Sequence, residues 1–233
     1  MSTAPAIGRT RAVLMSDPRF GAIPVQECGE RLVDLRLEDS ITVDPRRQDP
    51  AGAYAHVRSS VAGLLLAAQA ALPSGIRLLV IEGYRPPDLQ GRYFREYADV
   101  LCARNPHWDD AQLHAAASRF VSPSEIEPHT AGAAVDVTLV TANGRELDLG
   151  SRVGATPEES EGDCFTRAMD LTERAHSNRV LLCRVMEGAG LVNNGLQWWQ
   201  WSYGDPYWAM VTDRRAAIYA SIPSLHVSTG RRR

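Results

Sequence analysis

The chain has 233 residues, of which 44% are hydrophobic and 23% are charged, and these proportions are typical of a globular domain with one sizeable core. The formal charge of −3 gives no electrostatic basis for nucleic-acid binding. No apolar run approaches the roughly 18 residues that span a bilayer. We therefore expect a soluble, cytoplasmic protein without nucleic-acid or membrane partners. All 25 basic residues are arginine, which excludes chemistry that requires a lysine amine.

In chain order, residues 1–29 contain three prolines and are expected to form an N-terminal arm, followed by one domain over 30–225 and a frayed tail over 226–233. Alternation and apolar runs predict strands at 32–37, 77–81, 134–140 and 197–201. Long segments bounded by turn signals predict helices at 51–72, 89–103, 109–120 and 166–187. Strands and helices are interleaved, but the strands are too few for a doubly wound sheet, so we expect an α+β fold.

The four cysteines do not form a metal or redox motif. Cys28, Cys102, Cys164 and Cys183 are 74, 62 and 19 residues apart, and no pair has the short spacing of a zinc knuckle or a redox pair. We expect reduced thiols that are buried or half-buried.

Two segments carry polar residues at the ends of predicted strands. Between His129 and Asp136 lie glycine and alanine residues, which suit a loop turning into a strand, so that both side chains face one point. The spacing equally fits a surface histidine and an unrelated strand aspartate. Arg85 follows the strand at 77–81 and precedes two prolines, which suits two-point binding of a carboxylate; a structural salt bridge is the alternative.

A third segment, 197–205, contains three tryptophans within five residues. Alternation along a strand would place Trp199 and Trp201 on one face. A core strand, an interface in a homodimer and a stacking platform for single-stranded nucleic acid all fit this pattern, and the acidic charge balance disfavours the last. The positions of Trp198, Trp201 and Trp208 therefore leave the oligomeric state open.

Taken in order, these segments resemble the motifs of the VanX-type D-alanyl-D-alanine dipeptidases, zinc peptidases whose fold is shared with D,D-carboxypeptidases and the Hedgehog signalling domain. Residues 82–86 resemble the family's Asp/Glu-Gly-Tyr-Arg-Pro, and residues 129–139 its His-x-x-Gly-x-Ala-x-Asp-Leu-Thr-Leu. Residues 197–200 resemble its Glu-Trp-Trp-His. The resemblance extends from about residue 32 to 209, and it implies a small, mainly antiparallel sheet flanked by helices.

The resemblance also implies a zinc site, and here the chain departs from the family. The family's His, Asp and second His ligands map onto His129, Asp136 and Gln200, and its general base Glu maps onto Gln197. An amide oxygen is a poorer zinc donor than an imidazole nitrogen, and an amide takes no proton from water at neutral pH. We therefore expect no zinc, or weakly bound zinc.

Further departures lie near these positions. Glu127 replaces a family serine two residues before the first histidine, and Asn194 stands where some members have tyrosine. Val153 and Gly154 replace a segment whose aspartate, in the family, receives the amino group of the dipeptide. Arg85 is retained, and the resemblance implies that it stabilises a tetrahedral intermediate.

The expected catalytic residues are Arg85, His129, Asp136 and Gln197, and the expected substrate-binding residues are Arg85, Tyr84, Glu127 and Trp199. Three functions remain open. The first is a repurposed protein that binds a small amino-acid-like or dipeptide-like molecule and carries out non-hydrolytic acid–base or condensation chemistry, in a biosynthetic setting.

The second function is a residual zinc dipeptidase, with Gln200 ligating through its amide oxygen and Glu127 or Glu158 as the base. The third is a non-catalytic binding or regulatory pseudoenzyme. Replacing Arg85 with alanine would discriminate between turnover and binding alone.

Overall fold

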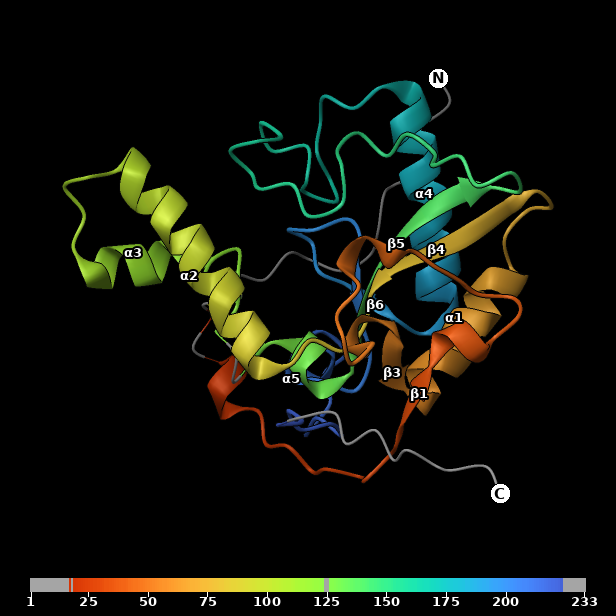
Figure 1. Ribbon diagram of the computed structural model, residues 1–233, viewed down its shortest axis with the longest axis horizontal. Coiled ribbons are helices and arrows are strands. Elements are labelled where there is room, and N and C mark those ends of the chain that lie inside the picture. Colours follow the sequence, from red (N-terminus) through yellow and green to blue (C-terminus); the bar gives the residue numbers. More distant parts are fainter. Residues whose placement is uncertain (1–16, 18, 124–125, 224–233) are drawn as a thin grey trace.

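A five-stranded sheet lies at the centre of the computed structural model, which describes residues 17, 19–123 and 126–223 (Figure 1). Its strand order is β2-β4-β5-β7-β6; β2 runs parallel to β4, and the other neighbours are antiparallel. The strands are β2 (Thr42–Val43), β4 (Ile76–Glu82), β5 (Ala134–Thr141), β6 (Val192–Asn193) and β7 (Gln200–Ser202). Two more, β1 (Leu32–Asp34) and β3 (His56–Arg58), form a separate antiparallel pair. The predicted α+β class, with a mainly antiparallel sheet, is confirmed.

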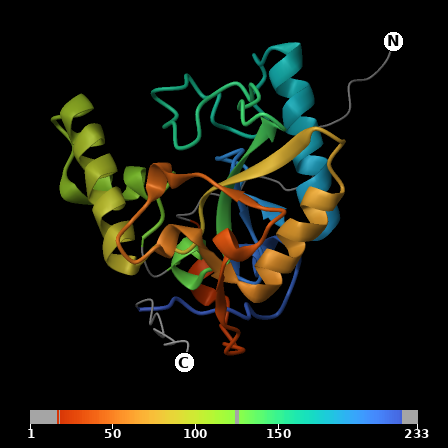
Figure 2. The same ribbon diagram turned by 45° about the vertical axis from the view of Figure 1, so that its right-hand side comes forward.

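The helices flank the sheet on two sides of the molecule. α1 (Ser59–Ala70) and α4 (Glu173–Ala189) pack together and contribute to the main core, whereas α2 (Pro87–Arg104) and α3 (Asp110–Ala117) lie on the opposite side (Figures 1 and 2). A short helix, α5 (Pro206–Val211), follows β7. None of the helices in the described ranges combines the length and apolar character that a membrane-spanning segment needs.

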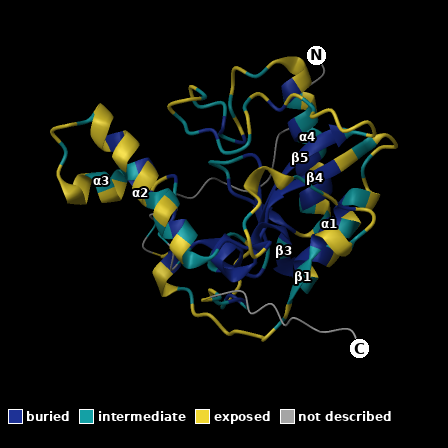
Figure 3. Cartoon of the chain, in the orientation of Figure 1, coloured by how far each residue is buried: buried dark blue, intermediate teal, exposed yellow. Residues whose placement is uncertain are grey.

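The two long strands β4 and β5 form the buried centre of the sheet (Figure 3). Leu78 and Val80 of β4 and Val135 and Val137 of β5 belong to the main hydrophobic core together with residues of α1 and α4. Because side chains alternate along a strand, the intervening residues of β5, including Asp136, face the other side of the sheet. That side is where the polar residues of the predicted site gather.

Three predicted elements have different boundaries, each for a local reason. The strand predicted at 32–37 ends at Asp34, because the Asp34 carboxylate accepts a hydrogen bond from the backbone N–H of Arg36 and caps a 3₁₀ turn at Leu35–Leu37. The helix predicted at 51–72 begins only at Ser59, because the preceding β3 pairs with β1. The helix predicted at 166–187 begins at Glu173, where the Thr172 hydroxyl caps it by accepting from Ala175 N–H.

The tryptophan segment belongs to the core. The strand predicted at 197–201 is observed at 200–202, and Trp198, Trp199 and Trp201 are all at most 2% exposed. Trp198 and Trp199 precede the strand and meet edge to face, with ring centroids 5.4 Å apart. Trp208 lies in a second core cluster with Phe20 and Tyr207. Burial thus accounts for these side chains without an interface.

The described part of the N-terminal arm packs against the domain. Phe20 stacks on Tyr207, and the Glu27 carboxylate forms an ion pair with Arg58 at 3.0 Å. Residues 1–16 and the tail predicted at 226–233 lie outside the described residues. All four cysteines are free; Cys164 and Cys183 are buried, but Cys28 and Cys102 are exposed, so the expectation of burial is wrong for these two.

Candidate functional site

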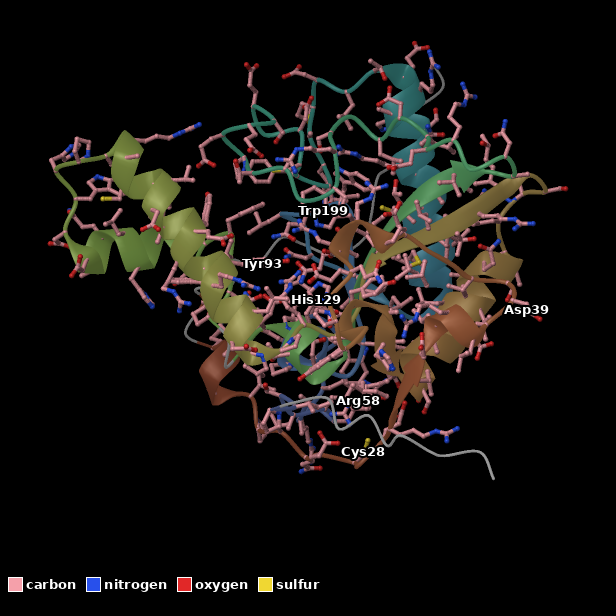
Figure 4. All side chains as sticks on the ribbon, viewed as in Figure 1. Cys28, Asp39, Arg58, Tyr93, His129 and Trp199 are labelled. Carbon is pink, nitrogen blue, oxygen red and sulfur yellow. The ribbon has the colours of Figure 1, made fainter. Side chains whose placement is uncertain are left out.

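A cavity of about 270 Å³ lies between α2 and one end of the sheet. Tyr93 of α2, His129 and Trp199 contribute to its lining, and Figure 4 shows these three side chains in the region between α2 and the strands. Of the residues predicted from the sequence, seven line the cavity: Arg85, Glu127, His129, Asp136, Gln197, Trp199 and Gln200. The structure therefore brings most of the predicted site together, although these residues come from widely separated segments.

A β-bulge in β4 brings three polar side chains into one row. Glu82 pairs with Asp136, and Asp136 pairs with Gln200, across three neighbouring strands. Between Val80 and Glu82 the register shifts by one residue, so that Glu82 lies on the Asp136 face of the sheet rather than on the face that packs against α1 and α4. Without the bulge, the Glu82 carboxylate would enter the apolar core.

Arg85 is held in the cavity wall by the side chains of two residues, Glu82 and Gln90. Its Nε and Nη2 atoms donate to the two carboxylate oxygens of Glu82 at 2.9 and 2.6 Å, and Nη1 donates to Gln90 Oε1 at 2.7 Å. Burial raises the pKa of Glu82, but Arg85 outweighs this effect and the pKa lies below its ordinary value. Both groups are therefore charged, and the guanidinium is already bound through two points by a protein carboxylate.

His129 and Asp136 form a second pair of ionisable side chains in the cavity. His129 lies in a 3₁₀ turn at Pro128–Ala131, where its Nδ1 is 2.6 Å from the carbonyl oxygen of Gly83 and its Nε2 is 3.2 Å from Asp136 Oδ1. Nδ1 is therefore the protonated nitrogen when the ring is neutral. Burial and the Arg85 cation lower the pKa of His129. The carboxylates of Asp136 and Glu127 raise it by more, so the pKa of His129 lies above its ordinary value.

Gln200 occupies the remaining ligand position, and both ends of its amide are hydrogen-bonded. Its Oε1 accepts from Asn194 Nδ2 at 2.6 Å, and its Nε2 donates to Glu127 Oε1 at 3.2 Å. With the amide reversed, the Gln200 NH₂ group would face the Asn194 NH₂ group, and the Gln200 oxygen would face the Glu127 carboxylate. The two hydrogen bonds therefore fix the orientation of the Gln200 amide. Glu127 also accepts from Gln90 Nε2 at 3.4 Å, which continues the chain of hydrogen bonds to Arg85.

The other predicted residues lie at different distances from this network. Gln197 lines the cavity, but its Nε2 donates to the carbonyl oxygen of Phe120 at 3.0 Å. Tyr84, predicted to bind substrate, is fully buried outside the cavity lining, where its hydroxyl donates to the carbonyl of Ile222. Glu158, considered as a replacement base, lines a neighbouring apolar cavity of about 300 Å³ and accepts from the Tyr97 hydroxyl.

Several residues of the site carry no signal in the sequence. Gln90 and Tyr93 lie on α2, and Arg47 ends a 3₁₀ turn after β2; all three line the cavity. Their positions depend on how α2 and the loop after β2 pack against the sheet. Only the resemblance pointed to Asn194, and it gave no indication that Asn194 would contact Gln200.

Comparison with known proteins defines the class of protein to which this fold and site belong. The sequence model of the M15 peptidases, described as D-Ala-D-Ala dipeptidase, matches residues 39–220. The chain therefore belongs to the D-Ala-D-Ala dipeptidase family.

Among individual relatives, the D-alanyl-D-alanine dipeptidase of Synechocystis sp. is 26% identical over 222 residues, which cover 83% of this chain and 90% of the relative. The enzyme of the same name from Escherichia coli K12 is 26% identical over 126 residues, 54% of each chain. Among solved structures, the vancomycin resistance D,D-pentapeptidase VanY in complex with Zn(II) aligns with 70% of this chain and 81% of its own, at 20% identity and a TM-score of 0.35.

The donor set of this chain does not fit the zinc centre that the family implies. Two ligand atoms about 2.0–2.1 Å from a tetrahedral zinc ion lie roughly 3.3 Å apart. The 3.2 Å between His129 Nε2 and Asp136 Oδ1 is, by itself, compatible with a shared zinc ion. The third position is an amide whose oxygen is already bound by Asn194. Among residues 17, 19–123 and 126–223, no three His, Cys, Asp or Glu side chains are placed to hold a metal ion. The same part of the chain has no buried side-chain donor or acceptor without a partner.

Proposed function

We propose that this chain is a repurposed member of its family, which binds a small amino-acid-like or dipeptide-like molecule in the polar cavity and does not hydrolyse it through zinc. The observation that carries the proposal is the hydrogen-bonded trio of Gln200, Glu127 and Asn194. All three residues depart from the pattern that the family resemblance implies, and Gln200 is hydrogen-bonded to both of the others. Three departures that these hydrogen bonds join together support replacement of the metal site as a unit, rather than random decay.

In this proposal the His129–Asp136 pair carries out acid–base chemistry. His129 Nε2 and Asp136 Oδ1 are within hydrogen-bonding distance at 3.2 Å. The Gly83 carbonyl at Nδ1 fixes the ring orientation, so that Nε2 is the nitrogen that faces Asp136. The Glu82 carboxylate holds the Arg85 guanidinium beside this pair, with Arg85 Nη2 3.8 Å from Asp136 Oδ2. Such an arrangement can hold a proton at Nε2 and exchange it with a ligand in the cavity.

A test combines metal content with turnover. Elemental analysis of purified protein is expected to give zinc well below one equivalent, and incubation with D-Ala-D-Ala is expected to give no D-alanine, with or without added zinc. Binding of the intact dipeptide, measured by calorimetry, is expected to be saturable. One equivalent of zinc together with dipeptide cleavage that EDTA abolishes would refute the proposal.

A zinc-dependent D-Ala-D-Ala dipeptidase is the second candidate. Family membership and the similarity to two proteins named D-alanyl-D-alanine dipeptidase favour it. In that case Gln200 would ligate through its amide oxygen, after releasing Asn194. The double substitution Gln197→Glu and Gln200→His separates the two candidates. A large gain in cleavage, from none to a measurable rate, favours the repurposed protein, whereas little change from an already active chain favours the dipeptidase.

A further inference from the structure

Arg47 is a cation in the lining of the polar cavity, and none of the ion pairs among the described residues includes it. The adjacent Arg46, by contrast, pairs with Asp44 at 2.8 Å and also with Glu146, and it does not line the cavity. The two arginines therefore differ in one respect that matters for a ligand. Arg46 is bound directly by two protein carboxylates, whereas Arg47 interacts with the Glu82 carboxylate only at longer range.

The strand arrangement explains why Arg47 reaches the cavity. β2 and β4 are parallel, so the loop after β2 leaves the sheet at the same end as Glu82. The N–H of Asp44 donates to the carbonyl of Val80 at 2.8 Å, which holds the start of that loop against β4. Arg47 lies three residues further on, at the end of the 3₁₀ turn Pro45–Arg47.

Contacts on two sides position the Arg47 guanidinium. Its Cζ lies 5.4 Å from the centroid of the Tyr93 ring, and Nη1 donates to the Tyr93 hydroxyl at 3.3 Å. On another side is Gly154, with a left-handed φ of +78°, where a Cβ atom would come within 3.1 Å of Arg47 Nη2. Gly154 thus provides the space that the guanidinium uses, and both residues line the cavity.

The charges of the cavity are unevenly distributed. Glu82, Glu127 and Asp136 are nearly buried, and the Arg85 cation beside them is bound through two points by Glu82. The three carboxylates outnumber the cationic groups beside them, Arg85 and the titratable His129, so the interior suits an ammonium group. The exposed part of the wall carries the Arg47 guanidinium and also the Glu96 carboxylate. A molecule with an amino group and a carboxylate matches both regions.

We infer that Arg47 is the anion-binding residue of this cavity and takes the carboxylate of a ligand whose amino group faces Glu127 and Asp136. The inference rests on the proposed function for the class of ligand, an amino acid or short peptide with a free carboxylate. It adds the orientation of that ligand and a specificity-determining residue. Arg47 needs no metal ion in this role.

The first experiment observes the arginine side chains directly. Protein labelled with ¹³C and ¹⁵N arginine is titrated with acetate, the simplest carboxylate, and the Arg47 side-chain signal is assigned by its loss in Arg47→Ala. Acetate is expected to shift the Arg47 signal saturably and to leave the Arg46 signal nearly unchanged. Equal, non-saturating shifts of both signals would overturn the inference, because they would indicate general ionic effects.

The second experiment compares D-Ala-D-Ala with its C-terminal amide by calorimetry. The amide is expected to bind wild-type protein about ten-fold more weakly, which corresponds to the loss of one charged hydrogen bond. In Arg47→Ala the two ligands are expected to bind equally, and in the matched control Arg46→Ala the ten-fold ratio is expected to persist. A ratio that persists in Arg47→Ala would overturn the inference. If neither dipeptide binds wild-type protein while acetate still saturates Arg47, the proposed function fails and the anion site stands.

Discussion

Replacing Gln200 with histidine most directly tests the proposal that this site works without a metal ion. The substitution removes two buried hydrogen bonds, one from Asn194 and one to the Glu127 carboxylate. A neutral hydrogen bond contributes about 1 kcal/mol, and one to a charged group about 1.5–3 kcal/mol. We therefore expect the free energy of unfolding of Gln200→His to be about 2–4 kcal/mol lower than that of wild-type protein, measured by urea denaturation in the presence of EDTA.

The same variant is expected to gain zinc-dependent stability, because it supplies the second imidazole beside His129 and Asp136. Zinc at 100 times its Kd stabilises a folded protein by about 2.7 kcal/mol. For a chain of this size, that corresponds to a rise in Tm of about 5–11 °C. Wild-type protein is expected to show no such rise in the same buffer.

Gln26→His is the matched control for this experiment, because Gln26 is exposed and lies outside the cavity lining. It adds an imidazole without adding a ligand to the site, so zinc is expected to leave its Tm unchanged. A zinc-dependent rise in wild-type protein equal to that of Gln200→His would refute the reasoning, since it would mean that the amide ligates zinc despite its hydrogen bonds.

Three further predictions concern Asp205, Arg179 and Gly83. Burial raises the pKa of Asp205 to about 6 from 3.8, so the folded state holds this proton more tightly than the unfolded state. From this group, the free energy of unfolding is expected to fall by about 2 kcal/mol between pH 4 and pH 7, and Asp205→Asn should flatten that part of the pH profile in urea denaturation. Arg179 is buried and donates to four backbone carbonyls. Arg179→Met is expected to lower the free energy of unfolding by about 3–6 kcal/mol, and a loss no larger than that of exposed Arg174→Met would contradict this role. A Cβ atom at position 83 would overlap a backbone carbonyl oxygen of β3. Gly83→Ala is therefore expected to lower the free energy of unfolding by about 2–3 kcal/mol and to displace the Gly83 carbonyl that orients His129. An unchanged Tm together with unchanged dipeptide binding would contradict this prediction.

The parts of the fold that follow from local pattern were predictable from the sequence. The apolar runs of β4 and β5 and the small residues between His129 and Asp136 predicted two strands and the convergence of those two side chains. Errors arose where a single side chain or a distant partner decides the structure. The Thr172 cap makes α4 begin at Glu173, later than predicted. Pairing with β1 makes His56–Arg58 a strand, although the alanine-rich sequence around it favours a helix.

The site was predictable only in part, for a related reason. Residues that belong to motifs, such as Arg85 and Asp136, were identified through the resemblance. The bulge before Glu82 leaves no mark in the sequence, yet it decides which face of the sheet that carboxylate occupies. Arg47 belongs to a polar loop like many others, and its role depends on the parallel pairing of β2 with β4 and on the space above Gly154.

The hydrogen bonds of Gln200 with Glu127 and Asn194 have a consequence for how mutations at this site combine. Because Gln200 is hydrogen-bonded to both residues, replacing Gln200 alone removes a partner from each of them, and replacing either partner leaves one end of the buried Gln200 amide unsatisfied. The stability effects of substitutions at the three positions are therefore expected to be non-additive. A variant that keeps the interior hydrogen-bonded has to change Gln200 together with at least one of its partners.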